Sequence, residues 1–136
     1  SRFVEAHDRS YSRALEEIRE GRKQSHWMWY IFPQIVGLGL SSTSRFYAIA
    51  DLEEARAYMQ HPMLGAHMIE ICGVLLGLSA NDAEDVMGYP DDLKLRSSMT
   101  LFSQAVPSVK IFQQVLDKYS DGKMDQKTLE ILGEHE

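Results

Sequence analysis

Apolar side chains recur along this chain of 136 residues mostly at the spacing of helix faces. Near the N-terminus, four of them follow the i, i+3, i+4, i+7 pattern of one helix face: Tyr11, Ala14, Leu15 and Ile18. Gly21 follows and can end that helix in the left-handed conformation. The apolar pattern extends backwards through residues 3–7, which predicts a short preceding helix. A chain with this periodicity is expected to fold by packing helices together.

Further helices are indicated by capping residues and by a proline. Asp51 is a predicted N-cap, and Glu54 lies three residues on, as in a capping box. Pro62 suits the first turn of the next helix, and the apolar run over residues 63–78 indicates a central buried helix. Three glycines in this run weaken the helix by themselves but predict close approach of neighbouring helices: Gly65, Gly73 and Gly77.

The C-terminal part of the chain has helix signals of the same kind. A short turn or helix is predicted from residue 81, ended by Gly88, and a longer helix begins at Pro90 and ends before Pro107. The candidate core residues of the longer helix are Leu93, Leu95, Met99, Leu101 and Phe102. An apolar stripe over residues 109–116 predicts a further helix, and Asp125 is placed to cap a last one.

The fold class follows from these patterns and from the composition. Strand-like β-branched runs and Asn-Gly turns are missing from the sequence. Hydrophobic residues make up 44% of the chain and charged residues 25%, which is ordinary for a globular protein and argues against disorder. The length allows one core. The sequence therefore predicts an all-α fold, a compact multihelical single domain over residues 1–136.

Charge and cysteine content restrict the partners and the compartment. The net charge of −6 argues against general nucleic-acid binding, which depends on neutralising phosphates. No stretch approaches the roughly 20 apolar residues of a membrane span, and the first residues lack a signal-peptide pattern. Cys72 is the only cysteine and lies in an apolar run, so we expect a buried, inert thiol. A cytoplasmic protein is the expectation.

The segment from His26 to Gln34 is the first candidate site. It holds both tryptophans, Trp27 and Trp29, and four aromatic residues within six positions. It could form a strand or one or two helical turns, of which we favour the helix. A cation, an imidazole and an amide flank the rings: Lys23, His26 and Gln34. Such a set could hold a nucleobase, a sugar or an acidic group, although the rings could equally be plain core.

A glycine- and serine-rich loop over residues 37–44 is the second candidate site. Backbone N–H groups at the start of a helix bind anions, and glycines let a phosphate approach closely. The residues that could contact an anion here are Gly37, Gly39, Ser41, Ser42 and Arg45. The simpler interpretation is a glycine turn followed by a serine N-cap.

The segment over residues 91–100 is the third candidate site. If it is helical, Lys94, Ser97 and Ser98 share one face. Asp91 lies near Lys94 and Leu95, and Asp92 is the carboxylate best suited to act as a general acid or base. An acid, a base and hydroxyl groups could orient a substrate, whereas the alternative is a solvated charged face with helix capping.

Other arrangements of reactive residues have weaker support. Ser41, His26 and Asp92 could be combined into a Ser-His-Asp triad, but no GxSxG motif accompanies them. His61 and His67 are six residues apart, which does not place both on one helix face, and no HExxH motif occurs. The sequence therefore predicts neither a metal site nor a cofactor.

The three candidate segments together resemble a family of small uncharacterised proteins, chiefly bacterial, known as a domain of unknown function. The matching stretches span nearly the whole chain, and the most specific are HWMWYIFPQ at 26–34 and SSMTLF at 97–102. The resemblance implies a mainly α-helical, compact fold and no established activity. Some members carry the label calpastatin, which does not fit, because true calpastatin is a disordered inhibitor and this composition is that of a folded domain.

A much more distant likeness connects the layout of the chain with the NADAR proteins. Those proteins act on ADP-ribose-type N-glycosides. No motif aligns residue by residue, so no catalytic residue is carried over from them.

The sequence therefore predicts a pocket for a small anionic ligand, such as a nucleotide sugar, with N-glycoside hydrolysis as a reaction it could support. His26 and Asp92 are the candidate catalytic residues. The candidate ligand-binding residues are Lys23, Trp27, Trp29, Gln34, Gly37, Gly39, Ser41, Ser42, Arg45, Lys94, Ser97 and Ser98. The alternative is a non-catalytic binding or protein-interaction module in which these polar residues are structural.

Overall fold

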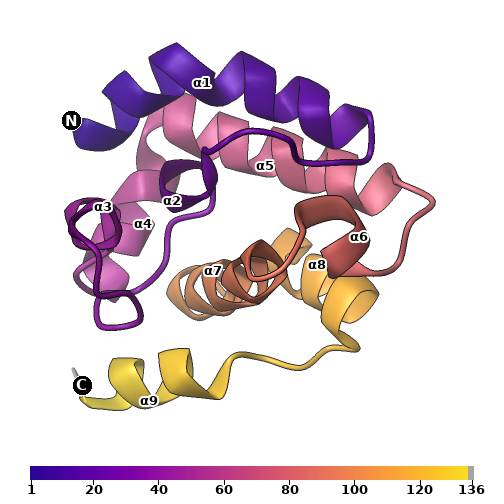
Figure 1. Ribbon diagram of the computed structural model, residues 1–136. Coiled ribbons are helices and arrows are strands. Elements are labelled where there is room, and N and C mark those ends of the chain that lie inside the picture. The colour runs from indigo at the N-terminus through magenta and orange to yellow at the C-terminus, as the bar shows by residue number, and fades with distance from the viewer. Residues whose placement is uncertain (135–136) are drawn as a thin grey trace.

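The computed structural model describes residues 1–134, which form nine helices joined by loops (Figure 1). The helices are α1 (Arg2–Arg19), α2 (Met28–Ile31), α3 (Ser42–Tyr47), α4 (Leu52–Gln60), α5 (Pro62–Gly77), α6 (Ala83–Met87), α7 (Asp91–Ala105), α8 (Ile111–Ser120) and α9 (Gln126–Glu134). Strand-like pairing in these residues is limited to one parallel bridge, between Ile35 and Ile49. The predicted all-α, compact fold is confirmed, while the predicted domain end at residue 136 lies outside the described residues.

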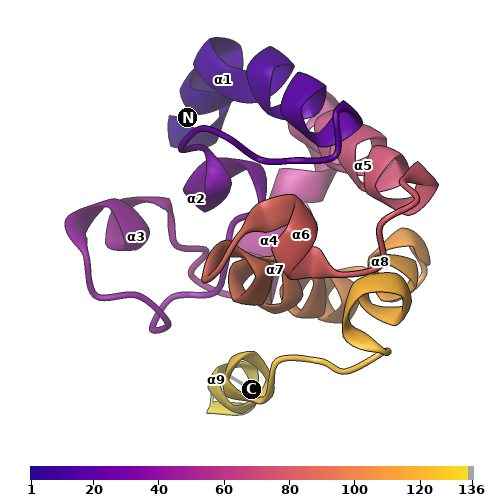
Figure 2. The same ribbon diagram turned by 45° about the vertical axis from the view of Figure 1, so that its right-hand side comes forward.

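The helices pack around α5 and α7. α1 lies along α5, and α5 also contacts α4 and α8. α7 contacts α4, α6, α8 and α9. The short helix α2 packs against α1, and α3 packs against α2, so that residues 28–47 form one side of the molecule (Figure 2). That side carries two of the three candidate segments.

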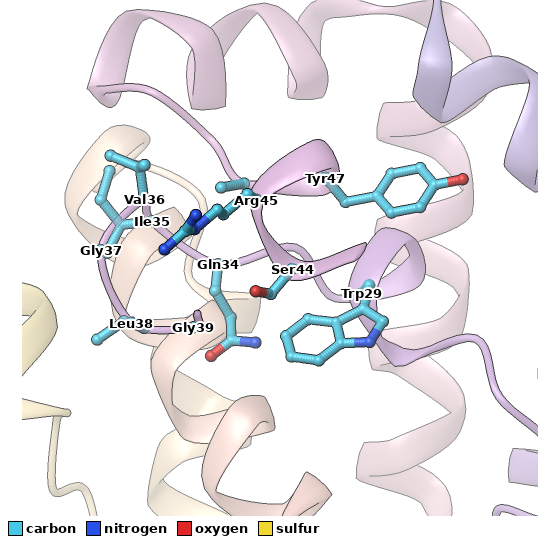
Figure 3. Close-up of a pocket in the computed structure, with 11 residues that line it drawn as sticks. Trp29, Gln34, Ile35, Val36, Gly37, Leu38, Gly39, Ser44, Arg45 and Tyr47 are labelled. Carbon is cyan, nitrogen blue, oxygen red and sulfur yellow. The ribbon is translucent and has the colours of Figure 1, made fainter. Parts of the chain in front are cut away.

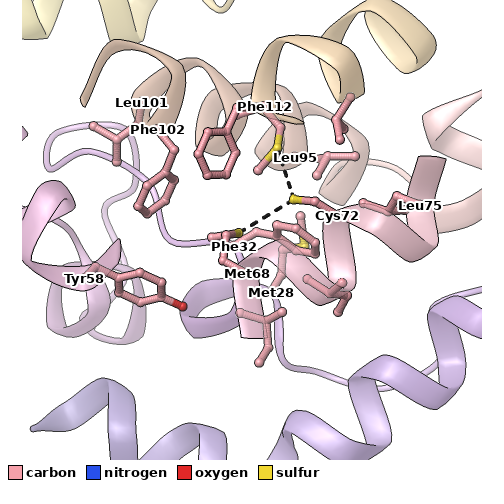
Figure 4. Close-up of a cluster of buried hydrophobic side chains, with 14 of the residues drawn as sticks. Met28, Phe32, Tyr58, Met68, Cys72, Leu75, Leu95, Leu101, Phe102 and Phe112 are labelled. Atoms are coloured by element: carbon pink, nitrogen blue, oxygen red, sulfur yellow. Dashed lines mark hydrogen bonds between the residues drawn. The ribbon is translucent and has the colours of Figure 1, made fainter. Parts of the chain in front are cut away.

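The core lies where α5, α7 and α8 meet (Figure 4). Phe102 and Phe112 pack here, and Phe32 enters from the aromatic segment. The Cys72 Sγ lies 3.9 Å from the Met68 Sδ and 3.8 Å from the Met99 Sδ. Burial raises the pKa of the Cys72 thiol, so the residue is the buried thiol that the sequence predicts.

The first helix is longer than the sequence analysis predicts. α1 runs without a break from Arg2 to Arg19, so the prediction of a separate short helix over residues 3–7 is wrong. The physical reason is that no glycine or proline interrupts this stretch and that the Ser1 hydroxyl accepts from the Val4 N–H at 3.3 Å, which caps the helix start. Gly21 follows the helix in the left-handed region, as expected, with φ of 84°.

The corner between α4 and α5 is defined by side-chain caps. The Asp51 carboxylate accepts from the Glu54 N–H at 2.9 Å, and the Glu54 carboxylate accepts from the Ala50 N–H at 2.7 Å. Pro62 opens α5 as predicted, and the His61 Nδ1 accepts from two N–H groups of its first turn. The imidazole cap is not apparent from sequence, because histidine is an uncommon N-cap.

Two predictions about packing need correction. Only Gly65 lies in a close approach, where a Cβ would overlap the Met59 carbonyl oxygen; Gly73 and Gly77 have no neighbour within 4 Å of a built Cβ. Leu93 is 42% exposed and is not a core residue, because it lies on the outer face of α7. None of the helices over residues 1–134 combines the length and apolar character needed to cross a bilayer.

Candidate functional site

The aromatic segment begins at a buried carboxylate on α1. The Glu17 Oε1 accepts from the backbone N–H of Gln24 at 2.7 Å and of Ser25 at 3.0 Å, and from the Trp27 indole N–H at 2.9 Å. The Ser25 hydroxyl donates to the other carboxylate oxygen at 2.5 Å. Burial opposes the charge on Glu17, but these hydrogen bonds outweigh it and lower its pKa to about 2. Glu17 therefore fixes the entry of the segment.

The two tryptophans of the segment lie in different surroundings. Trp27 is 1% exposed and belongs to the core, with its indole N–H satisfied by Glu17. Trp29, in the single turn of α2, is only partly buried. The predicted helical conformation is confirmed for Met28–Ile31. Trp27 precedes this turn as its N-cap residue, and Trp29 lies within it.

Two lysines from distant parts of the chain share one carboxylate beside these rings. The Lys23 Nζ lies 2.8 Å from the Asp91 Oδ2, and the Lys94 Nζ lies 2.9 Å from the Asp91 Oδ1. The Lys94 Nζ is 4.2 Å from the Trp29 ring centroid, and the Lys23 Nζ is 5.0 Å from that of Trp27. Burial alone would raise the pKa of Asp91, but its hydrogen bonds to both lysines lower it. Asp91 is therefore an ionised, fully partnered carboxylate.

A cleft of about 230 Å³ opens between the loop after the aromatic segment and the start of α7. We call it the Trp29 cleft. Its polar and aromatic lining consists of Trp29, Gln34, Lys94, Ser97 and Asp125, with Gly39 and apolar residues at the margin. The Ser97 hydroxyl donates to the Leu93 carbonyl at 3.1 Å, and the Asp125 carboxylate accepts from the Thr128 N–H at 2.9 Å as the cap of α9.

Two smaller spaces share the Trp29 ring with this cleft. A slot of about 20 Å³ lies between Trp29, Gln34, Ser44, Arg45 and Tyr47. Figure 3 shows the Gln34 amide and the Ser44 hydroxyl beside the Trp29 indole. A third space, of about 70 Å³, is lined by Trp29 together with the lysine pair and Asp91. Trp29 is thus the wall that the three spaces have in common.

The structure brings together predicted residues from all three candidate segments. Those that line the Trp29 cleft or its slot are Trp29, Gln34, Gly37, Gly39, Arg45, Lys94 and Ser97. Those that line the third space are Lys23, His26, Trp27, Trp29 and Lys94. His26 is an exposed residue at that edge.

Four of the predicted residues line none of these spaces. The Ser41 hydroxyl accepts from the Ser44 N–H at 3.1 Å and caps α3, and Ser42 is an exposed residue of that helix, which matches the simpler interpretation of the loop. Ser98 is fully buried. Asp92 has a buried carboxylate oxygen with no hydrogen-bond partner among the described residues. Ser41, His26 and Asp92 therefore share no pocket in which a triad could act.

Some of the residues at the site were missed from the sequence. Asp91 is the carboxylate that contacts both lysines. Its spacing of i, i+3 predicts the contact with Lys94, but no local signal indicates the contact with Lys23, and Asp91 is absent from the predicted site residues. Tyr47 and Asp125 reach the site from outside the three segments, and no local pattern marks them. Among residues 1–134, no group of three or more potential metal-ligating side chains occurs.

A larger hollow, of about 420 Å³, adjoins the third space through Lys23, which lines both. It is lined by Arg22, Lys23, Glu84, Asp85, Val86 and Gly88. These side chains mix both signs of charge and include no aromatic ring, whereas ligand sites usually combine apolar walls with a few polar groups. The Trp29 cleft is therefore the better candidate site.

Comparison with known proteins places the chain in a family. It matches, over residues 1–132, the family described as Protein of unknown function (DUF1810). It is also similar to the crystal structure of the conserved hypothetical protein Rv1873 from Mycobacterium tuberculosis, with 45% identity, a TM-score of 0.95, and coverage of 97% of this chain and 94% of that chain. None of the curated proteins matches the sequence. The resemblance to an uncharacterised family is confirmed, and the chain belongs to the DUF1810 family.

Proposed function

We propose that the Trp29 cleft binds a small ligand that carries a planar ring and an anionic group. The observation behind this proposal is the position of Lys94, whose ammonium lies 2.9 Å from Asp91 and 4.2 Å from the Trp29 ring centroid in the cleft wall. An ammonium has three N–H donors, and Asp91 accepts from one of them. A donor is therefore left for an anionic ligand group beside an aromatic ring.

The size of the cleft favours a small ligand. Pockets for drug-sized molecules usually measure about 300–1,000 Å³, and this cleft measures about 230 Å³. A nucleobase or a sugar phosphate suits this volume. The adjoining slot, of about 20 Å³, has room for little more than one water molecule and therefore adds no space for a longer nucleotide sugar. The Gln34 amide can both donate and accept, as recognition of a base edge or a sugar hydroxyl requires.

The geometry favours binding over N-glycoside hydrolysis. General acid catalysis by a carboxyl group needs a free group with a raised pKa at the scissile bond. Asp91 is held by two lysines with a lowered pKa, and Asp125 caps α9. Asp92, the carboxylate that the sequence predicts as a general acid or base, does not line the cleft. We therefore place non-catalytic binding first and keep hydrolysis as the second candidate.

The test is a titration of tryptophan fluorescence with ADP-ribose, NAD, AMP, ribose 5-phosphate and simple carboxylates. We expect a saturable change with one class of ligand and no turnover when the mixture is examined for released base or sugar. Lys94→Gln should weaken that binding roughly 10- to 100-fold, as loss of a charge-assisted hydrogen bond predicts.

The matched control is Lys110→Gln, because Lys110 is exposed and lines no part of the cleft. This variant should bind like the wild type. A flat response across the panel, or equal affinity in Lys94→Gln, would show that the cleft is not an anion-binding site. Release of product at a rate that exceeds the uncatalysed one would favour hydrolysis instead.

A further inference from the structure

α1 has two buried polar residues, and both are directed at the segment that carries Trp29. Glu17 holds the start of that segment through the bonds to Ser25 and Trp27 described above. His7, which is 3% exposed, lies about three turns earlier on α1 and contacts the carbonyl of Tyr30 within the segment. α1 therefore contacts the segment that carries Trp29 at two places, through Glu17 before Trp29 and through His7 after it.

The contacts of His7 favour one tautomer. Its Nε2 lies 3.0 Å from the Tyr30 carbonyl oxygen, which can only accept a hydrogen bond, and 3.0 Å from the Tyr58 hydroxyl, which can donate or accept. The Tyr58 hydroxyl donates to the same carbonyl at 3.3 Å, so its oxygen is free to accept from His7. We therefore assign the proton of the neutral ring to Nε2, where both oxygens can accept it. Tyr30 follows Trp29 in α2, a helix of one turn whose last carbonyl groups have no partner within the helix.

The other nitrogen of His7 is paired with a second histidine. The His7 Nδ1 lies 2.9 Å from the Nδ1 of His67, on α5. Only one proton fits between two nitrogens at this distance, and His7 already has its proton on Nε2. A neutral His7 thus accepts from His67, whose ring is stacked on Tyr11 with the centroids 3.5 Å apart. The Tyr11 hydroxyl in turn donates to Glu70 at 2.5 Å.

We propose that His7 is a positioning residue for the Trp29 cleft, which accepts from His67 and donates to the Tyr30 carbonyl, and thereby holds the turn that presents Trp29. The proposal rests on the function proposed above for the cleft. It assigns a role to a residue that touches no ligand and lies behind the site. It also links the cleft to the packing of α1 on α5.

Protonation of the histidine pair gives the arrangement a pH dependence. One further proton can bind at the unprotonated Nε2 of His67 without breaking the hydrogen bond between the two Nδ1 atoms. When both rings are cations, each Nδ1 carries a proton, so two N–H donors face each other and the rings must separate. Burial is the main cause that lowers the pKa of His7, to about 4, and it lowers that of His67 as well. Asp8 and Glu70 favour the charged forms, whereas His61 opposes the charge on His7.

The first test does not depend on any ligand. Nitrogen-15 NMR of the histidine rings at neutral pH should show His7 protonated at Nε2 and His67 protonated at Nδ1. The indole N–H resonances of the two tryptophans give the second readout, with Trp27 as the internal reference because Glu17 holds it. On acidification toward pH 4, the Trp29 resonance should move with the titration of the pair.

Two variants distinguish a role of His7 in positioning Trp29 from a role in filling space in the core. His7→Leu removes the donor to Tyr30, so we expect a shifted Trp29 resonance and roughly tenfold weaker binding of ADP-ribose. His7→Gln keeps an amide donor and does not titrate. It should restore the resonance and the affinity at neutral pH, and it should abolish the pH response that is assigned to the pair. Titration of Asp91 near Trp29 is present in both proteins and therefore cancels in the comparison.

An Nδ1-protonated His7, or a Trp29 resonance that is unchanged in a folded His7→Leu variant, would overturn the proposal. Failure of His7→Gln to rescue a folded protein would do so as well. If ADP-ribose does not bind the wild type, the function proposed for the cleft fails for this ligand, but the two NMR readouts still decide the role of His7.

Discussion

Trp27 and Trp29 are two residues apart in the same motif, yet they take opposite roles. Trp27 is 1% exposed, and its indole N–H is bound to Glu17. Trp29 is partly exposed and lines the cleft with Lys94 over its ring. Each ring has a lysine nearby and both lysines share Asp91, so charge does not distinguish them. The difference lies in the backbone: Trp27 precedes the single turn of α2 in a non-helical conformation, whereas Trp29 lies within the turn.

The largest expected effect is on the free energy of unfolding, which should fall much more for Trp27→Ala than for Trp29→Ala. Trp27→Ala should cost about 3–5 kcal/mol, because it leaves a large cavity and removes a partner of Glu17. Trp29→Ala should cost about 1 kcal/mol, since its ring is already partly in water. Urea unfolding followed by circular dichroism measures both. Equal losses would mean that Trp29 is also a core residue, and that the cleft is not a separate feature.

Glu17 accounts for the second largest effect, through its hold on Trp27. Glu17→Ala leaves four donors without their acceptor, of which the Trp27 indole N–H is fully buried, and should cost about 3 kcal/mol, whereas Glu17→Gln keeps an acceptor oxygen and should cost about half as much. Because the pKa of Glu17 is lowered from 4.5 to about 2, its stabilising effect is present above pH 4.5 and lost as the pH falls through about 2.

Unfolding measured across that pH range provides the check. The wild type should lose about 3 kcal/mol between pH 4.5 and 2 from this group, and Glu17→Gln should not show that part of the loss. Parallel pH profiles of the two proteins would show that the carboxylate does not hold Trp27 as an ion.

Substitution of Trp29 should mainly lower ligand affinity, whereas substitution of Trp27 should mainly lower the stability of the fold. Trp29→Leu removes the aromatic face and should weaken a ring-containing ligand by about 1–3 kcal/mol, the usual contribution of stacking on an aromatic side chain. Trp29→Phe keeps part of that face and should lose less. Isothermal titration with the ligand found in the fluorescence panel measures both changes. Equal affinity in wild type and Trp29→Leu would remove Trp29 from the site.

The helices are predictable from the sequence because their signals are local. The stripe ending at Ile18, the Asp51 cap and Pro62 each act within a few residues, and each is where the structure has it. Gly65 and Gly73 show the limit of such signals. Both interrupt the same apolar run, but only Gly65 faces a neighbouring carbonyl, and nothing in the local pattern tells them apart.

The candidate site was predictable only in part, because it depends on contacts between distant segments. The aromatic motif and Lys94 were found from residue type and spacing. Asp92 lines none of the three spaces, whereas its neighbour Asp91 lines one of them, because one residue along a helix turns a side chain by about 100°. The spacing to Lys94 indicates Asp91, but its contact with Lys23 is visible only in the structure. Likewise, His7 looks like part of an apolar stripe until His67 and Tyr30 are seen beside it.

The smallest expected effect concerns Asp91, which connects the surroundings of the two tryptophans. Asp91→Asn removes the charge that holds Lys23 and Lys94, and a partly exposed ion pair of this kind contributes about 1 kcal/mol. The lowered pKa of Asp91 means that this stabilisation is present above pH 3.8 and lost as the pH falls below it. The Trp29 indole resonance should shift more than that of Trp27, because Glu17 still holds Trp27 in place. Equal shifts would mean that the two rings respond as one unit, and that the division between core and cleft does not lie between them.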